Sequence, residues 1–214
     1  MLLVLSILWR WQADAAQGFI AVARMVAQLL LIGYVLVYIF EADTPWIVLF
    51  VVAVMVIAAS WIALRTVPRL RGQLYRLVSA SVLFGGGTTL ALITQFVLTL
   101  EPWYEPSVVV PLAGMIFAAS MNAVSLAAER MFAELDRGVG FDEARRIAIQ
   151  AGLIPITNSL LAVGLVSLPG FMTGQILSGI SPLIAVRYQV MVMCMIFGAS
   201  GLSAALFLTL VRRD

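Results

Sequence analysis

The residues of this chain that could do chemistry are polar and sulfur-bearing side chains set within long apolar stretches. The densest group is the stretch 164–179, which reads G-L-V-S-L-P-G-F-M-T-G-Q-I-L-S-G and contains four glycines and Pro169. Irregular backbone at membrane depth is tolerated only where protein or a water-filled cavity satisfies its polar groups. The stretch is therefore a candidate break beside a transport pathway. A simple helix kink is the alternative, because Pro and Gly are common in membrane helices.

The donor groups available to such a pathway are thioethers and amides. The chain offers no carboxylate or imidazole cage for a hard cation, and none of its eleven Asp and Glu residues lies in the middle of an apolar stretch. Proton-coupled transport is disfavoured for the same reason, since it needs an ionisable relay group in the membrane. Methionines in helices also serve as packing filler. The candidate pathway-lining residues are Met115, Met121, Asn122, Asn158, Pro169, Met172 and Gln175.

Two missing residue types exclude most catalytic chemistry. All thirteen basic residues are arginine, and the sequence contains neither lysine nor histidine. A phosphate-binding G-x-x-x-x-G-K-[ST] loop, an H-E-x-x-H zinc site and a Ser-His-Asp triad are therefore impossible within this chain. We predict no catalytic residues, no cofactor bound by this chain and no nucleic-acid partner. Cys194 is the single cysteine, and its apolar surroundings predict a small buried hydrophobic residue.

The composition defines the class of protein. Hydrophobic residues make up 63% of the 214 residues, charged residues only 11%, and the mean hydropathy is +1.06. These values predict an all-α polytopic membrane protein forming one integral-membrane domain over residues 1–214. We expect six full transmembrane helices plus a short or truncated N-terminal apolar segment, Met1–Leu8. The expected spans are 19–40, 46–64, 77–100, 108–128, one from residue 147 through the glycine-rich stretch, and 188–211.

The arginines predict the orientation. Arg65, Arg69, Arg71 and Arg76 follow the second expected span within one short loop, and Arg212 and Arg213 follow the last span. Under the positive-inside rule, both positions are cytoplasmic. We therefore expect a multi-pass protein of the inner membrane with the N-terminus outside and the C-terminus in the cytoplasm.

The only long polar segment is 129–146, which holds nine of the chain's twenty-four charges with apolar residues between them. This pattern favours a short amphipathic helix lying on the cytoplasmic face, where a partner protein could bind it. A solvated loop with frayed helix ends is the alternative.

Several motifs resemble those of the FetB-type ABC transporter permeases, a family of bacterial iron-export permeases with plant relatives linked to aluminium tolerance and UDP-glucose transport. The longest is Gln150-Ala-Gly-Leu-Ile-Pro155-Ile-Thr-Asn158-Ser159 followed by residues 163–177. Shorter matches lie at 28–36, 113–116, 120–126 and 185–189. Three features depart from the family pattern: Ala118-Ala119 replaces Gly-Asn, the first apolar segment is short, and the segment between Arg130 and Ala151 is shorter.

The resemblance implies a permease subunit that exports a metal ion such as iron. It would act as a homodimer in the lipid bilayer with a separate ABC ATPase subunit, which would use the ATP. The segment 129–146 would then couple the two proteins, with Phe141 as the apolar anchor and with Glu143, Arg145 and Arg146 at the rim. The alternatives are a transport-inactive paralogue or membrane scaffold, favoured by the shortened segment, and a secondary transporter.

Overall fold

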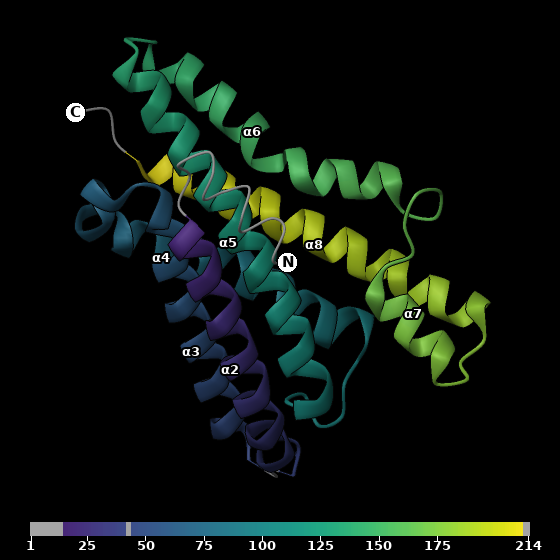
Figure 1. The fold of residues 1–214 in the computed structure, drawn as a ribbon. Coiled ribbons are helices and arrows are strands. Elements are labelled where there is room, and N and C mark those ends of the chain that lie inside the picture. Colours follow the sequence, from purple (N-terminus) through teal and green to yellow (C-terminus); the bar gives the residue numbers. More distant parts are fainter. Residues whose placement is uncertain (1–14, 42–43, 212–214) are drawn as a thin grey trace. The chain divides into compact units, whose positions relative to one another are not determined.

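A computed structural model describes residues 15–41 and 44–211, and the chain divides into two compact units, residues 1–47 and 48–214 (Figure 1). The first unit contains helix α2, Ala15–Phe40, in which Arg24 and Gln28 are both exposed. The apolar segment Met1–Leu8 and the location of the N-terminus lie outside the described residues.

The second unit is built from helices. Helix α3, Pro45–Ala63, begins at the end of the first unit and is followed by the 3₁₀ turns Leu64–Thr66 and Pro68–Leu70. Proline occupies the first turn of both α5 and α8, where its fixed φ favours a helix start and its missing N–H is not needed. The remaining elements are α4, Arg71–Leu92, with a π-helical turn at Ile93–Val97; α5, Pro106–Asp136; α6, Phe141–Ala162; α7, Gly170–Leu177; and α8, Pro182–Leu210.

Five helical segments of the described chain are long and apolar enough to cross a membrane. They are Phe19–Phe40, Pro45–Thr66, Pro68–Val97, Pro106–Asp136 and Pro182–Leu210. They match five of the six expected spans, and the all-helical membrane fold is confirmed. The sixth expected crossing, from residue 147 to the end of the glycine-rich stretch, consists of two helices, α6 and α7, separated by irregular chain.

The core of the second unit lies where α4, α5 and α8 pack together. Ile116, Phe117 and Phe207 are almost completely buried there. Gly85 and Gly86 of α4 face this core, and a Cβ at Gly85 would lie 2.6 Å from the backbone nitrogen of Ser203 in α8. The Gly-Gly-Gly run therefore serves helix packing, as expected for small residues in a membrane protein.

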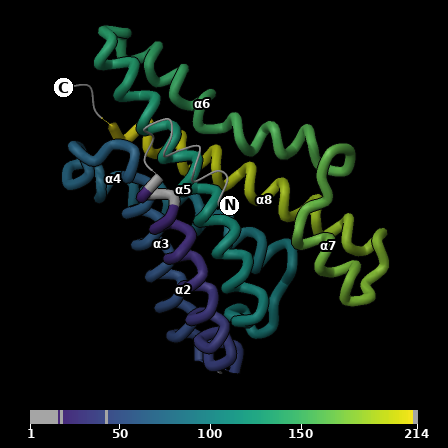
Figure 2. The backbone as a smooth tube through the Cα atoms, in the orientation of Figure 1, coloured from purple at the N-terminus to yellow at the C-terminus, as the bar shows by residue number. Residues whose placement is uncertain are grey.

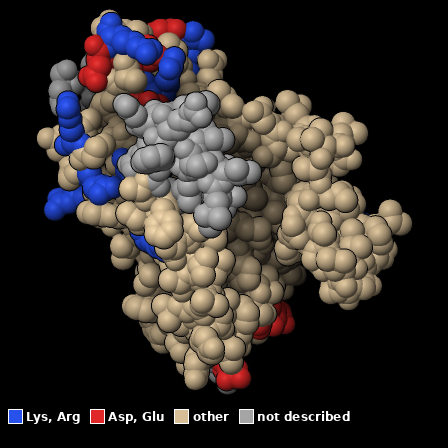
Figure 3. All heavy atoms as spheres, in the orientation of Figure 1, with Lys and Arg blue, Asp and Glu red and all other residues tan. Residues whose placement is uncertain are grey.

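The arginine-rich segment 65–76 and the α5–α6 turn, both in the second unit, lie at the same end of the helices. The hydroxyl of Thr66, in the turn before α4, donates a hydrogen bond to the carbonyl oxygen of Ser125 in α5 at 3.2 Å. Arginine side chains gather over the start of α4 and the α5–α6 turn in the space-filling view (Figure 3). Arg187 lies apart from these segments and lines a hollow with Val97 and Leu98, at the start of the acidic 98–105 connection.

Two expectations about individual segments were wrong. Residues 129–146 do not form a separate helix on the surface. They form the end of α5, a turn, and the start of α6, because the buried stripe of α5 continues through Met131 and Glu134. Gly138 adopts φ +82°, a backbone conformation that favours glycine, and ends the helix there. Cys194 is exposed rather than buried.

Candidate functional site

The break between α6 and α7 is the most irregular feature of the apolar region. After Ala162 the chain forms a tight turn in which the carbonyl oxygen of Ala162 accepts hydrogen bonds from the backbone N–H groups of Val166, at 2.8 Å, and Ser167, at 3.2 Å. Gly164 has φ +82°, which few residues other than glycine adopt. The backbone then leaves the helical path until α7 begins after Pro169, as the tube in Figure 2 shows. The glycine-rich stretch is thus a true interruption and not a kink.

The tip of this break is exposed. Leu165 is 90% exposed and Val166 is 84% exposed. These apolar side chains suit a lipid or protein environment and cannot line a polar pathway. The polar side chains of the stretch that could line a pathway therefore lie in α7, which follows the break.

One cavity of about 320 Å³ lies between α5, α7 and α8 and brings together two of the predicted lining residues, Met115 and Gln175. The side-chain oxygen of Gln175 is buried and has no hydrogen-bond partner among the residues that the structure describes. Tyr188 and Met191 of α8 complete the polar and sulfur-bearing part of the lining. An unsatisfied buried amide oxygen is costly unless a ligand or water completes it, so this cavity is a candidate binding site.

A second cavity, of about 340 Å³, lies beside the break itself. Met172 of α7 and Gly164 line it, together with Gln189, Met193 and Cys194 of α8. Gln189 is only 5% exposed, and its side-chain oxygen likewise has no hydrogen-bond partner within the described part of the chain. Sequence reasoning did not select Gln189. The signal that could have identified Gln189 is a single amide side chain within a long apolar helix.

The other predicted lining residues are placed differently. Asn122 of α5 and Asn158 of α6 are exposed on the surface of the second unit, Met121 is half-buried, and none of the three lines either cavity. Pro169 is the residue at which α7 begins. The structure thus joins Met115 with Gln175 and places Met172 nearby on α7, but it does not collect all the predicted residues in one site.

The atoms in these cavities that could bind a metal ion are soft sulfur atoms or neutral oxygen atoms. No group of three or more His, Cys, Asp or Glu side chains that could hold a metal ion occurs in the described part of the chain. Thioether and thiol sulfur with amide oxygen can make transient, weak contacts with a passing ion. A permanently bound hard cation would need more carboxylates than these surroundings provide.

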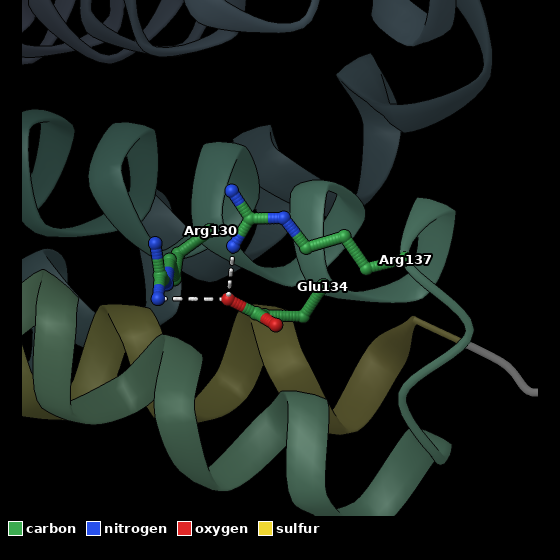
Figure 4. A network of polar contacts seen from close by, with 3 residues as sticks. All are labelled: Arg130, Glu134 and Arg137. Atoms are coloured by element: carbon green, nitrogen blue, oxygen red, sulfur yellow. Dashed lines mark hydrogen bonds and ion pairs between the residues drawn. The ribbon is translucent and has the colours of Figure 1, made fainter.

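The C-terminal end of α5 is held by an ion-pair network (Figure 4). Glu134 is buried, and one of its carboxylate oxygens lies 2.7 Å from Nη2 of Arg130 and 3.1 Å from Nη1 of Arg137. Both guanidinium groups converge on this oxygen from opposite sides of Glu134 in the sequence. The last turn of α5 and the start of the turn into α6 are therefore fixed relative to each other.

The first turn of α6 carries the predicted coupling residues. Phe141 is half-buried, and the guanidinium of Arg145 lies 6.0 Å from its ring centre. Arg146 donates two hydrogen bonds to Glu143, at 2.6 and 2.9 Å, which lower the pKa of that carboxyl and raise the pKa of the guanidinium. Arg145 pairs with Asp142 at 3.2 Å. The structure thus presents a half-buried aromatic ring among exposed, internally paired charges.

Long apolar helices, one interrupted crossing with adjoining cavities, and charges gathered at one helical end define a polytopic helical membrane protein. The chain belongs to the uncharacterised protein family UPF0014, whose profile matches residues 1–140 and 136–214.

Its relatives include named membrane proteins of bacteria and plants. The UPF0014 membrane protein slr1647 of Synechocystis is 35% identical over 97% of this chain and 86% of its own length. The probable iron export permease protein FetB of Escherichia coli is 34% identical over 90% of this chain and 79% of its own length. Protein ALUMINUM SENSITIVE 3 of Arabidopsis thaliana is 31% identical over 86% of this chain and 71% of its own length. No solved structure is significantly similar to the chain.

The comparisons also bear on the length of the α5–α6 connection. The alignment with the Synechocystis relative runs over 226 positions although 97% of this 214-residue chain takes part, so about 18 positions lack a counterpart here. The two family matches meet at residues 136–140, which is the α5–α6 turn. We infer that the shortening lies at this turn, where α5 and α6 are joined by only four residues.

Proposed function

We propose that this chain is the membrane permease subunit of an ABC transporter that exports a metal ion, with iron as the first candidate, energised by a separate ATPase. The observation that carries the proposal is the similarity over 90% of the chain to a protein named a probable iron export permease. The chain has no lysine for a phosphate-binding loop, so any ATP hydrolysis that drives transport would come from a partner protein. ATP would then be bound by that partner, and the permease would act as a homodimer in the inner membrane.

The fold supplies the parts that this function needs. The α5–α6 turn would receive the ATPase, because it lies at the arginine-rich end and presents Phe141 beside exposed charges. Helix α6 leads from this turn to the break at 163–169, so a movement of the turn would be passed to α7. The cavity at Met115 and Gln175, which α7 lines, would then open or close.

The orientation follows from the same charges. We place the 65–76 segment, the α5–α6 turn and the C-terminus in the cytoplasm, and the 98–105 connection outside. Six crossings from α2 onward would place the start of α2 on the same side as the C-terminus. The expected outside N-terminus would therefore require that residues preceding α2 also cross the membrane.

The test is co-purification. The tagged chain is expressed together with each candidate ABC ATPase of its source organism and isolated from membranes in mild detergent. We expect the ATPase to be retained and its hydrolysis to be stimulated, whereas the purified chain alone hydrolyses no ATP. A chain that retains no ATPase under these conditions would instead be a transport-inactive paralogue or scaffold.

A further inference from the structure

The surface shared by α5 and α6 exposes polar side chains at a depth where lipid would otherwise surround them. Asn122 lies fourteen residues before the end of α5, roughly 21 Å along the helix at 1.5 Å per residue. Thr157 and Asn158 lie sixteen and seventeen residues after the start of α6, at roughly 24 to 26 Å. All three side chains are exposed, and none hydrogen-bonds to any residue that the structure describes.

These polar residues lie on one side of the α5–α6 pair. Leu126 and Ile154 line the same open groove between the two helices. Asn122 precedes Leu126 by four residues, and Thr157 and Asn158 follow Ile154 by three and four, so each lies on the groove-lining face of its helix. Gly152 of α6 lies at the level of Ala123 of α5, because a Cβ on Gly152 would lie 2.8 Å from the carbonyl oxygen of Ala123. The two asparagines therefore lie within about 8 Å of the same depth.

Lipid cannot provide hydrogen-bond partners for the polar side chains of this surface. Asn, Thr and other polar side chains in membrane helices face protein or water, because hydrocarbon offers no hydrogen-bond partner. An asparagine amide carries both donors and an acceptor, so it can pair with the same residue of an identical chain across a two-fold axis. Ala118 is exposed one turn before Asn122, and its small side chain allows a second backbone to approach closely.

We propose that a second copy of this chain covers the α5–α6 face, with Asn122 and Asn158 forming hydrogen bonds across the two-fold interface. This inference rests on the homodimer of the proposed function and names its contact surface. The surface includes Ala118, Asn122 and Leu126 of α5 with Ile154, Thr157 and Asn158 of α6.

The first experiment is cysteine cross-linking in native membranes with Cys194→Ala as the background. Ala118→Cys is compared with Phe84→Cys, an exposed position on α4 that is 62% accessible. Copper phenanthroline should convert at least about five times more of the Ala118→Cys protein than of the Phe84→Cys protein to a covalent dimer. Equal conversion at both positions would overturn the proposal. A cross-link within one chain between Ala118→Cys and Gln28→Cys would also overturn it, because α2 would then be the cover.

The second experiment measures how much the two asparagine amides contribute to dimer formation. The double variant Asn122→Leu, Asn158→Leu should dissociate to monomers at about tenfold higher protein concentration than the wild type in detergent, as followed by native mass spectrometry. Its unfolding temperature as a monomer should be unchanged or higher, which shows that the fold is intact. An unchanged dimer would overturn the proposal. ATPase capture by the wild type is scored separately, so a missing ATPase contradicts only the proposed function.

Discussion

The carboxylate of Glu134 lies 2.7 Å from the guanidinium of Arg130, one turn earlier in α5, although Glu134 is buried and Arg130 is partly exposed. Arg137 binds the same carboxylate oxygen at 3.1 Å from the turn that follows. One buried acid thus ties the last turn of α5 to the α5–α6 connection.

Replacing that acid should loosen the turn. We expect Glu134→Ala to lower the free energy of unfolding by about 1 to 2 kcal/mol, because two guanidinium groups lose their common partner while remaining partly hydrated. Asp136→Ala, an exposed acid two residues later with no ion pair to a described residue, should change it by less than about 0.5 kcal/mol. Thermal unfolding in detergent measures both. Equal shifts for the two variants would show that Glu134 does not fix the turn.

Two neighbouring glycines provide a matched test of the core. Gly85→Ala should destabilise the protein by about 1 to 3 kcal/mol, because the new Cβ would meet the backbone of Ser203 at 2.6 to 2.8 Å. At Gly87 the nearest atom to a new Cβ is a Leu83 methyl at 3.9 Å, so Gly87→Ala should be neutral or slightly stabilising. Thermal stability of the two purified variants is the measurement. A tolerated Gly85→Ala would contradict the close packing of α4 against α8.

The orientation is tested by cysteine accessibility in the Cys194→Ala background. Trp103→Cys should react with a membrane-impermeant maleimide in intact cells, because the 98–105 connection is placed outside. Asp136→Cys, at the end of α5, should react only after the cells are opened. The reverse pattern would invert the topology.

The anchor role of Phe141 predicts a large effect on ATPase capture. Phe141→Ala should weaken it about 30-fold or more, since truncating a central aromatic at an interface typically costs about 2 kcal/mol. Arg146→Ala removes an exposed, internally paired charge and should act weakly and mainly at low salt. Pull-down at matched expression compares the two. Undiminished capture by Phe141→Ala would rule out this residue as the anchor.

The cavity at Met115 and Gln175 should matter for export. Met115→Leu keeps the volume of the side chain but removes its sulfur, so the fold should persist while metal tolerance and efflux fall several-fold. Met121→Leu, which does not alter this cavity, should have little effect. Efflux of radiolabelled iron from loaded cells is the readout. Equal behaviour of both variants would remove Met115 from the pathway.

Hydropathy alone predicted five of the crossings and the helical class, because a membrane helix must satisfy its own backbone and present apolar side chains along its whole length. The break at 163–169 was also predictable, since Gly164 and Pro169 act on the local backbone. The orientation was also predicted from the sequence, because the arginine content of each loop can be read from it directly.

Only the tertiary structure decided which face of each helix is covered. Lipid is as apolar as the protein interior, so apolar side chains in a membrane helix carry little information about their neighbours. Cys194 was therefore predicted to be buried and is exposed. The packing of Gly85 against Ser203 joins positions far apart in the sequence. The polar segment 129–146 was misassigned because its buried stripe continues that of α5, a continuity that becomes visible only once α5 and α6 pack against each other.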